Sequence, residues 1–142
     1  MIRMVTKAMF FDRKKVLGAV DRTTRKVLSR FGAFVRTTAR HSIRKRKGVS
    51  EPGSPPSGHV GLLKKLILFG YDANRRSVVI GPMPLRSGPG EAPSLLEYGG
   101  RARRKDRRGR NVTATYRPRP FMGPAFENEK PKLPAMWADS VR

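Results

Sequence analysis

The 142-residue sequence contains no cysteine, two histidines and ten acidic residues, and only 8% of its residues are aromatic. The lack of cysteine excludes disulfides and thiolate metal sites. His41 and His59 match no metal-binding spacing, and the scattered acids form no pair suited to general acid–base catalysis. We therefore expect a protein that is not an enzyme and that has no catalytic residue, no metal and no cofactor.

Long apolar segments are also missing. The longest strongly apolar run, Leu66–Tyr71, is far shorter than a bilayer span. The first residues, MIRMVTKAMFFDRKK, do not resemble a secretory signal, because Arg3 and Lys7 interrupt the apolar side chains. The sequence thus predicts a soluble protein that is made inside the cell and does not associate with a membrane.

Positive charge, in contrast, is abundant: 32 lysines and arginines give a formal net charge of +22. Such a chain repels copies of itself and attracts polyanions or acidic protein surfaces. The hydrophobic fraction of 37% is low, but the length fits a single domain, residues 1–142, with a modest core. Nucleic-acid binding, assembly against acidic partners and a partly disordered basic protein all remain open at this point.

Residues 12–47 predict one long helix, because no proline interrupts them and apolar or small side chains recur every three or four positions. Asp12 is the expected N-cap, and Gly18 and Gly32 each cost about 1 kcal/mol relative to alanine. Such a helix spans roughly 50 Å and must overhang its own core. The basic opposite face fits either a solvated surface or a contact with nucleic acid or acidic protein. The apolar stripe consists of Val16, Val20, Thr24, Val27, Phe31, Phe34, Val35, Thr38 and Ile43.

A sheet region is expected over residues 59–126, after a Pro-, Gly- and Ser-rich loop at 48–58. Val60–Lys65 fits a short helical turn. Leu66–Tyr71 and Ser77–Ile80 then predict a β-hairpin, because two apolar runs flank a short polar turn. The second strand is apolar at successive positions, which predicts that both of its faces are buried.

A second loop at 82–93 and a short helical segment at 94–100 lead into a strongly basic run at 101–110. A run of this charge density is normally disordered in isolation and forms an interaction loop. NVTATY, residues 111–116, returns to a β-forming pattern. The residues that we expect to contact DNA or a protein partner are Arg101, Arg103, Arg104, Lys105, Arg107, Arg108 and Arg110.

The segment YRPRPFMGPAF, residues 116–126, excludes both a central strand and an ordinary helix. Pro118 and Pro120 predict a rigid extended corner, with Phe121, Met122 and Phe126 anchored in the core; the alternative for this segment is a direct partner contact through Arg117 and Arg119. We expect Pro124 to start a C-terminal helical segment, residues 124–142. Pro131 and Pro134 predict that this segment is a short helix, a kink and a further turn.

The order of these elements, with the motifs LLEYG and RPRPFMGPAF, resembles the tail-completion and neck proteins of long-tailed bacteriophages, also called the head–tail joining or minor-tail-protein Z-like family. The resemblance covers residues 12–126. It implies an α+β fold in which a long N-terminal helix packs on a small, mainly antiparallel sheet, followed by a short C-terminal helix. The motif residues with an implied structural role are Leu96, Glu97, Tyr98, Gly99, Pro118, Arg119, Pro120, Phe121 and Pro124.

The resemblance further implies a structural virion protein, made in the host cytoplasm, that forms a hexameric ring at the head–tail junction. Its neighbours would be the portal or adaptor and the tail ring proteins, and DNA would pass through the channel of this connector. Tail-completion, head-closure and terminator roles remain open, and so does whether the basic run faces DNA or protein. The alternative function is that of a basic protein that binds nucleic acid non-specifically, which positive charge alone favours.

Overall fold

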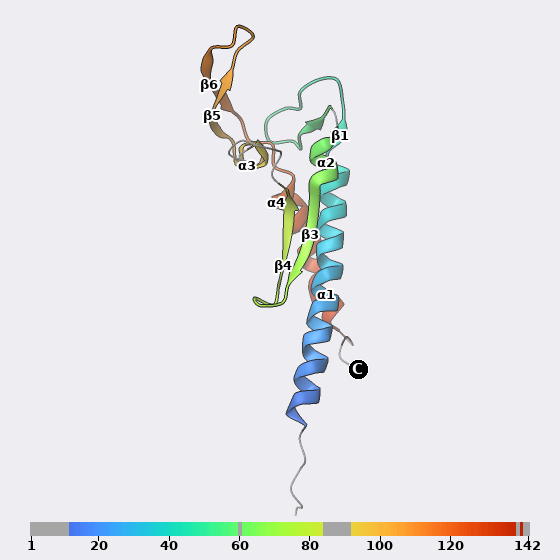
Figure 1. The fold of residues 1–142 in the computed structure, drawn as a ribbon. Helices are drawn as coiled ribbons and strands as arrows, with labels where there is room; N and C mark the ends of the chain where they lie inside the picture. Colours follow the sequence, from blue (N-terminus) through green and yellow to red (C-terminus); the bar gives the residue numbers. More distant parts are fainter. Residues whose placement is uncertain (1–11, 60, 84–91, 139, 141–142) are drawn as a thin grey trace, which may run out of the picture.

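The computed structural model describes residues 12–59, 61–83, 92–138 and 140, and it confirms the predicted α+β class. Figure 1 shows α1 as the long axis, with one hairpin beside its middle and a second hairpin projecting beyond its C-terminal end. Predictions for residues 1–11, and for most of the loop at 82–93, lie outside the described residues. In chain order the elements are α1 (Arg13–Ser42), β1 (Arg44–Lys45), β2 (Ser57–Gly58), α2 (Leu62–Leu66), β3 (Ile67–Asp72), β4 (Ser77–Pro82), α3 (Ala92–Tyr98), β5 (Gly100–Lys105), β6 (Asn111–Tyr116), α4 (Met122–Glu129), η1 (Lys130–Lys132) and α5 (Leu133–Trp137).

Helix α1 begins as predicted but ends early. The Asp12 carboxylate accepts a hydrogen bond from the Lys15 amide at 3.0 Å, which confirms the N-cap. The helix ends at Ser42 instead of continuing to residue 47, because Ile43 adopts an extended conformation and buries its side chain in the core. Strand β1 then pairs in parallel with β2. Burial and strand pairing are tertiary contacts, and here they outweigh local helix propensity.

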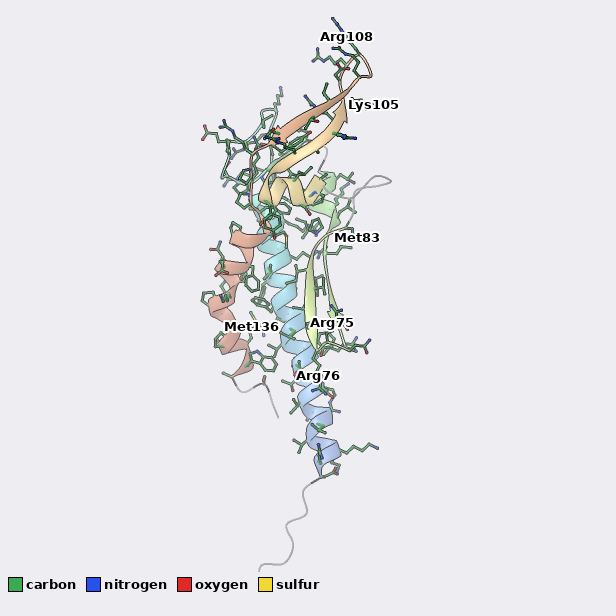
Figure 2. The ribbon with its side chains drawn as sticks, turned by 90° about the vertical axis from the view of Figure 1, so that its left-hand side faces the viewer. Arg75, Arg76, Met83, Lys105, Arg108 and Met136 are labelled. Carbon is green, nitrogen blue, oxygen red and sulfur yellow. The ribbon has the colours of Figure 1, made fainter. Side chains whose placement is uncertain are left out.

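The hydrophobic core lies on the second half of α1. Figure 2 shows α1 in the middle, with α4, η1 and α5 along one side and the β3–β4 hairpin along the other. Full burial of a valine, isoleucine or phenylalanine side chain stabilises the fold by about 1.5–3 kcal/mol. This cluster therefore fixes the three layers relative to one another. Its buried members are Phe31, Val35, Ala39, Ile43, Ile67, Phe121 and Ala125.

At Gly32, α1 lies in close contact with the β3–β4 hairpin. A Cβ atom at this position would lie 2.7 Å from a Val78 methyl carbon and 3.0 Å from the Phe69 ring. At Gly18, in contrast, the nearest atom to such a Cβ is the end of the Arg22 side chain at 3.6 Å. Gly32 is thus required by packing, whereas Gly18 is not.

The strands form three separate pairs, and the β3–β4 hairpin is the pair that covers α1. Its register runs from Ile67 opposite Pro82 to Asp72 opposite Ser77, which confirms the predicted hairpin. The prediction that both faces of β4 are buried was wrong, because Val79 is 65% exposed. Only one face of this two-stranded ladder meets α1, so alternate side chains point away from the core.

The C-terminal segment is broken as the prolines predict, into α4, η1 and α5. Helix α4 starts at Met122, so Pro124 is its third residue and not its first, which corrects the expected start. Phe121 is buried as predicted. Phe126 remains 41% exposed and reaches the core through one edge-to-face contact with Phe31, with ring centroids 5.8 Å apart. Its predicted role as a core anchor therefore holds only in part.

Glu129 ties the end of α4 to α1. Its buried carboxylate accepts hydrogen bonds from Lys132 Nζ at 2.8 Å and from Thr38 Oγ1 at 2.7 Å. The bond from Lys132, followed by that from Thr38, lowers the pKa of Glu129 below its ordinary value of 4.5. The carboxylate is therefore charged at neutral pH, and both of its partners stabilise that charge.

Candidate nucleic-acid and partner interface

The β5–β6 hairpin, residues 100–116, carries all seven basic residues that the sequence singled out, and we refer to it as the hairpin arm. Residues 101–110 were expected to form an interaction loop without regular structure; that expectation was wrong for residues 101–105, which belong to β5, whereas residues 106–110 do form the loop between the two strands. Strand β5 pairs antiparallel with β6 along its whole length, from Gly100 opposite Tyr116 to Lys105 opposite Asn111. The β-forming segment that follows supplies the partner strand, which the composition of the basic run does not reveal.

The two faces of the hairpin arm differ in chemistry, because side chains alternate along a strand. One face, which we call the cationic face, is formed by three basic residues of β5 opposite three polar residues of β6, and all six are exposed. The opposite face carries Ala102, Val112, Ala114 and Tyr116 and only one basic residue, Arg104. The members of the cationic face are Arg101, Arg103, Lys105, Asn111, Thr113 and Thr115.

Asp106 holds the turn of the arm. Its Oδ1 accepts hydrogen bonds from the amides of Arg108 at 2.8 Å and Arg110 at 2.9 Å, and its Oδ2 pairs with Arg110 Nε at 3.0 Å. The amide of Arg110 is the main reason that the pKa of Asp106 is lowered from its ordinary value. Arg110 is therefore partly neutralised, whereas Arg107 and Arg108 lie in the turn, with Arg108 at the tip in Figure 2.

The base of the arm is held by Glu97 of α3. Its Oε2 accepts hydrogen bonds from the amides of Phe121 at 2.9 Å and Met122 at 3.0 Å, and its Oε1 accepts one from Gly123 at 2.7 Å. Phe121, the residue at the N-cap position, has no side-chain acceptor, so Glu97 caps α4 from another element. This contact joins the two sequence motifs, LLEYG and RPRPFMGPAF, in space.

The extended corner between β6 and α4 is held by further hydrogen bonds. The Arg119 amide donates to the Leu96 carbonyl at 2.6 Å, and Arg119 Nε donates to the Ser50 carbonyl at 2.9 Å. The Pro118 carbonyl accepts from the Gly53 amide at 2.9 Å. Pro118 and Pro120 therefore lie where the corner contacts the 48–58 loop and α3. Pro120 directly precedes Phe121, which is buried. The structure thus shows the predicted extended corner, held by hydrogen bonds to two other segments.

Gly99 allows the chain to leave α3 and enter the arm. Its φ of +73° is in the left-handed region, and a Cβ there would lie 2.9 Å from the Tyr116 carbonyl oxygen. Its neighbour Tyr98 is 82% exposed, so the implied structural role of this motif residue is not seen within the chain. Tyr98 is instead an aromatic side chain available at the surface, at the foot of the arm.

Two apolar surfaces remain open on the rest of the described chain. The first, which we call the α1 overhang, consists of Val16, Leu17 and Val20, each at least 40% exposed. Figure 1 shows these first turns of α1 extending past the tip of the β3–β4 hairpin, where Arg76 pairs with Asp21 at 3.3 Å. The overhang continues the apolar stripe of α1 beyond the core that the chain itself provides.

The second apolar surface is the outer face of the β3–β4 hairpin. The residues that point away from α1 include Leu68, Gly70, Val79 and Gly81, which carry no charge, while Asp72 shares this face at the turn end of the hairpin. Leu68 is 40% exposed and Val79 is 65% exposed. Large uncharged patches are unusual on a monomer surface and commonly mark contacts with other proteins.

We also searched the described part of the chain for metal sites and for membrane-spanning helices. His41 and His59 are both exposed, and no three His, Asp or Glu side chains in the described ranges are grouped to hold a metal ion. No helix among those residues combines the length and the hydropathy that crossing a bilayer requires. The described surface is thus characterised by the cationic face, the turn arginines and two uncharged apolar patches.

Comparison with known proteins gave no match: no family model, no curated protein and no solved structure is significantly similar to this chain. The site must therefore be understood from its own geometry. Sequence reasoning missed the capping role of Glu97 and the ion pair that the buried Glu129 carboxylate makes with the exposed Lys132. A glutamate directly before the last residue of a short helix gives no local sign of capping a helix 25 positions away.

Proposed function

We propose that this chain is a structural virion protein that forms a ring at the head–tail junction of a long-tailed bacteriophage, as a tail-completion or neck component. The order of the elements and the two joined motifs support this assignment. The observation that carries it is the pair of uncharged apolar surfaces, the α1 overhang and the outer face of β3–β4, on a chain that is otherwise strongly cationic.

Charge restricts how copies of this chain can meet. At +22 each, two copies repel wherever basic surfaces face one another. Six acidic side chains already form ion pairs within the chain, so they are poorly available to a neighbour. Contact between copies is therefore favoured at the two apolar surfaces, where burial of uncharged area contributes about 25 cal/mol per Å².

The two apolar surfaces are different from each other, which favours a ring. When one surface of a copy packs on a different surface of the next copy, the contact is heterologous and the chain of contacts closes into a ring if the rotation permits. In the proposed assembly the α1 overhang of one copy packs against the outer face of β3–β4 of its neighbour. The ring is proposed to be hexameric, with the portal or adaptor and the tail ring proteins above and below it and DNA in its channel.

Sedimentation of the purified protein, together with a reconstruction of the intact particle, tests the proposal. We expect Val16→Ser/Val20→Ser to reduce the oligomeric fraction. Val49→Ser/Leu62→Ser removes two exposed apolar residues outside both surfaces and should leave that fraction unchanged. Equal effects of the two variants would contradict the proposed contact, and absence of this chain from the head–tail junction would overturn the assignment.

A second candidate function is that of a basic protein that binds nucleic acid non-specifically without belonging to a particle. The seven basic residues of the hairpin arm, against a single acid, favour it. This alternative predicts a chain that stays monomeric on nucleic acid and has no fixed position in the virion. The same sedimentation experiment, repeated with a short DNA duplex, separates the two functions.

A further inference from the structure

The cationic face of the hairpin arm presents its charges in a regular row. Arg101, Arg103 and Lys105 alternate with residues that point the other way, so neighbouring charges are separated by two residues, or about 7 Å. No acid of the arm lies on this face, because Asp106 is engaged in the turn with Arg108 and Arg110. The three charges are thus left without an internal partner among the described ion pairs.

The chemistry of the face fits a phosphodiester backbone. Arginine, lysine, threonine and asparagine are among the side chains that donate hydrogen bonds to phosphate oxygens, and they make up all six of its positions. We propose that the cationic face binds the backbone of duplex DNA without reading its sequence. This inference deepens the proposed function, because it assigns the arm to the DNA in the channel and not to a neighbouring protein.

Two features of the arm favour duplex DNA over other polyanions. Single-stranded nucleic acid is typically held by aromatic side chains on which bases stack, and Tyr116, the one aromatic of the arm, belongs to the opposite face. Protein interfaces usually have an apolar or aromatic centre, and the cationic face has none. A duplex needs neither, since its backbone is a continuous row of negative charge on the outside.

The arm is also held in place before any ligand binds. Asp106 holds its turn, while Glu97 and Arg119 hold the segments that flank its base, which are α3 and the corner before α4. Figure 2 shows Lys105 and Arg108 at the far end of the arm, away from α1 and the core. The charges are therefore presented at a distance from the apolar surfaces that the proposed ring uses.

Fluorescence anisotropy with a short DNA duplex of mixed sequence tests the proposal on the purified full chain. Binding is measured from about 50 to 200 mM salt, where the slope of log K against log salt concentration is about −0.9 per phosphate neutralised. We expect Arg101→Gln/Arg103→Gln/Lys105→Gln to reduce the salt slope by about 3 and to weaken binding about a hundredfold near 0.1 M salt. Two duplexes of unrelated sequence should bind equally well.

A variant with the same charge loss elsewhere is the control. Lys14→Gln/Arg25→Gln/Lys65→Gln removes three exposed cations that are far from the arm in sequence and form none of the described ion pairs. It should change the slope by less than about 1. Far-UV circular dichroism and thermal unfolding establish that both variants are folded.

Several results would overturn the inference. Equal slopes for the two triple variants would mean that binding is a diffuse effect of net charge. Tighter binding of a single strand than of the duplex would identify single-stranded nucleic acid as the ligand. A strong preference between the two duplexes would mean that the arm reads sequence. Arm-dependent binding of poly-glutamate without binding of the duplex would identify an acidic protein as the ligand. Because the assay uses the isolated chain, loss of DNA binding and loss of ring assembly are observed separately.

Discussion

Replacing Glu97 with alanine removes the carboxylate that receives the first amides of α4. Three backbone donors, those of Phe121, Met122 and Gly123, lose their acceptor together. The same substitution disconnects α3 from α4 at the foot of the hairpin arm. We therefore expect both a lower free energy of unfolding and a looser base of the arm.

The size of the loss follows from which donors water can reach. The Gly123 amide is exposed, so water replaces the carboxylate there at little cost, whereas the bonds from Phe121 and Met122 are partly buried. An N-terminal cap contributes about 0.5–2 kcal/mol, and a hydrogen bond to a charged group about 1.5–3 kcal/mol. We expect Glu97→Ala to lower the free energy of unfolding by about 2–3 kcal/mol, which corresponds to a decrease in Tm of roughly 6–12 °C.

Urea and thermal unfolding, followed by circular dichroism, measure this difference. Glu127→Ala is the matched control, because Glu127 lies on α4, the helix that Glu97 caps, is exposed and makes a single surface ion pair with Lys130 at 3.7 Å. It should cost less than about 1 kcal/mol. If Glu97→Ala were no more destabilising than Glu127→Ala, the capping role assigned to Glu97 would be refuted.

Three further predictions concern single positions. Gly32→Ala should lower the free energy of unfolding by about 1–2 kcal/mol, because its Cβ meets the β3–β4 hairpin, whereas Gly18→Ala should raise it by about 0.5–1 kcal/mol; urea unfolding measures both. The lowered pKa of Glu129 means that its carboxylate stabilises the fold above pH 4.5 and that this contribution is lost as the pH falls through the folded-state value; the stability difference from Glu129→Gln, followed by urea unfolding, should therefore shrink as the pH falls below 4.5. Asp106→Ala should accelerate amide hydrogen exchange at Arg110 in the turn of the arm, while α1 keeps its protection.

Each of these expectations has an outcome that would contradict it. A stabilising Gly32→Ala would mean that helix propensity outweighs the close approach to the hairpin. A pH-independent difference between the wild type and Glu129→Gln would mean that charge contributes nothing at that position. Unchanged exchange at Arg110 would show that the turn is held without Asp106.

Local patterns in the sequence were sufficient for much of the fold. The apolar period in α1, the Asp12 cap, the β3–β4 hairpin and the proline breaks near Pro131 and Pro134 are effects of neighbouring residues, and all were predicted correctly. The early end of α1 was not, because it depends on Ile43 entering a core that distant segments complete. The same limit explains why residues 101–105 of the basic run were taken for part of a loop, because their strand depends on pairing with β6.

For the candidate site, the sequence by itself determined which residues carry positive charge and that they are concentrated in residues 101–110. Tertiary structure alone decided that Arg101, Arg103 and Lys105 share one face while Arg104 lies on the other, since a face exists only once β5 has paired with β6 in a fixed register. It also decided that Glu97 caps α4 from α3. Charge and periodicity are properties of neighbouring residues, whereas register and capping between elements depend on contacts that form when distant segments fold together.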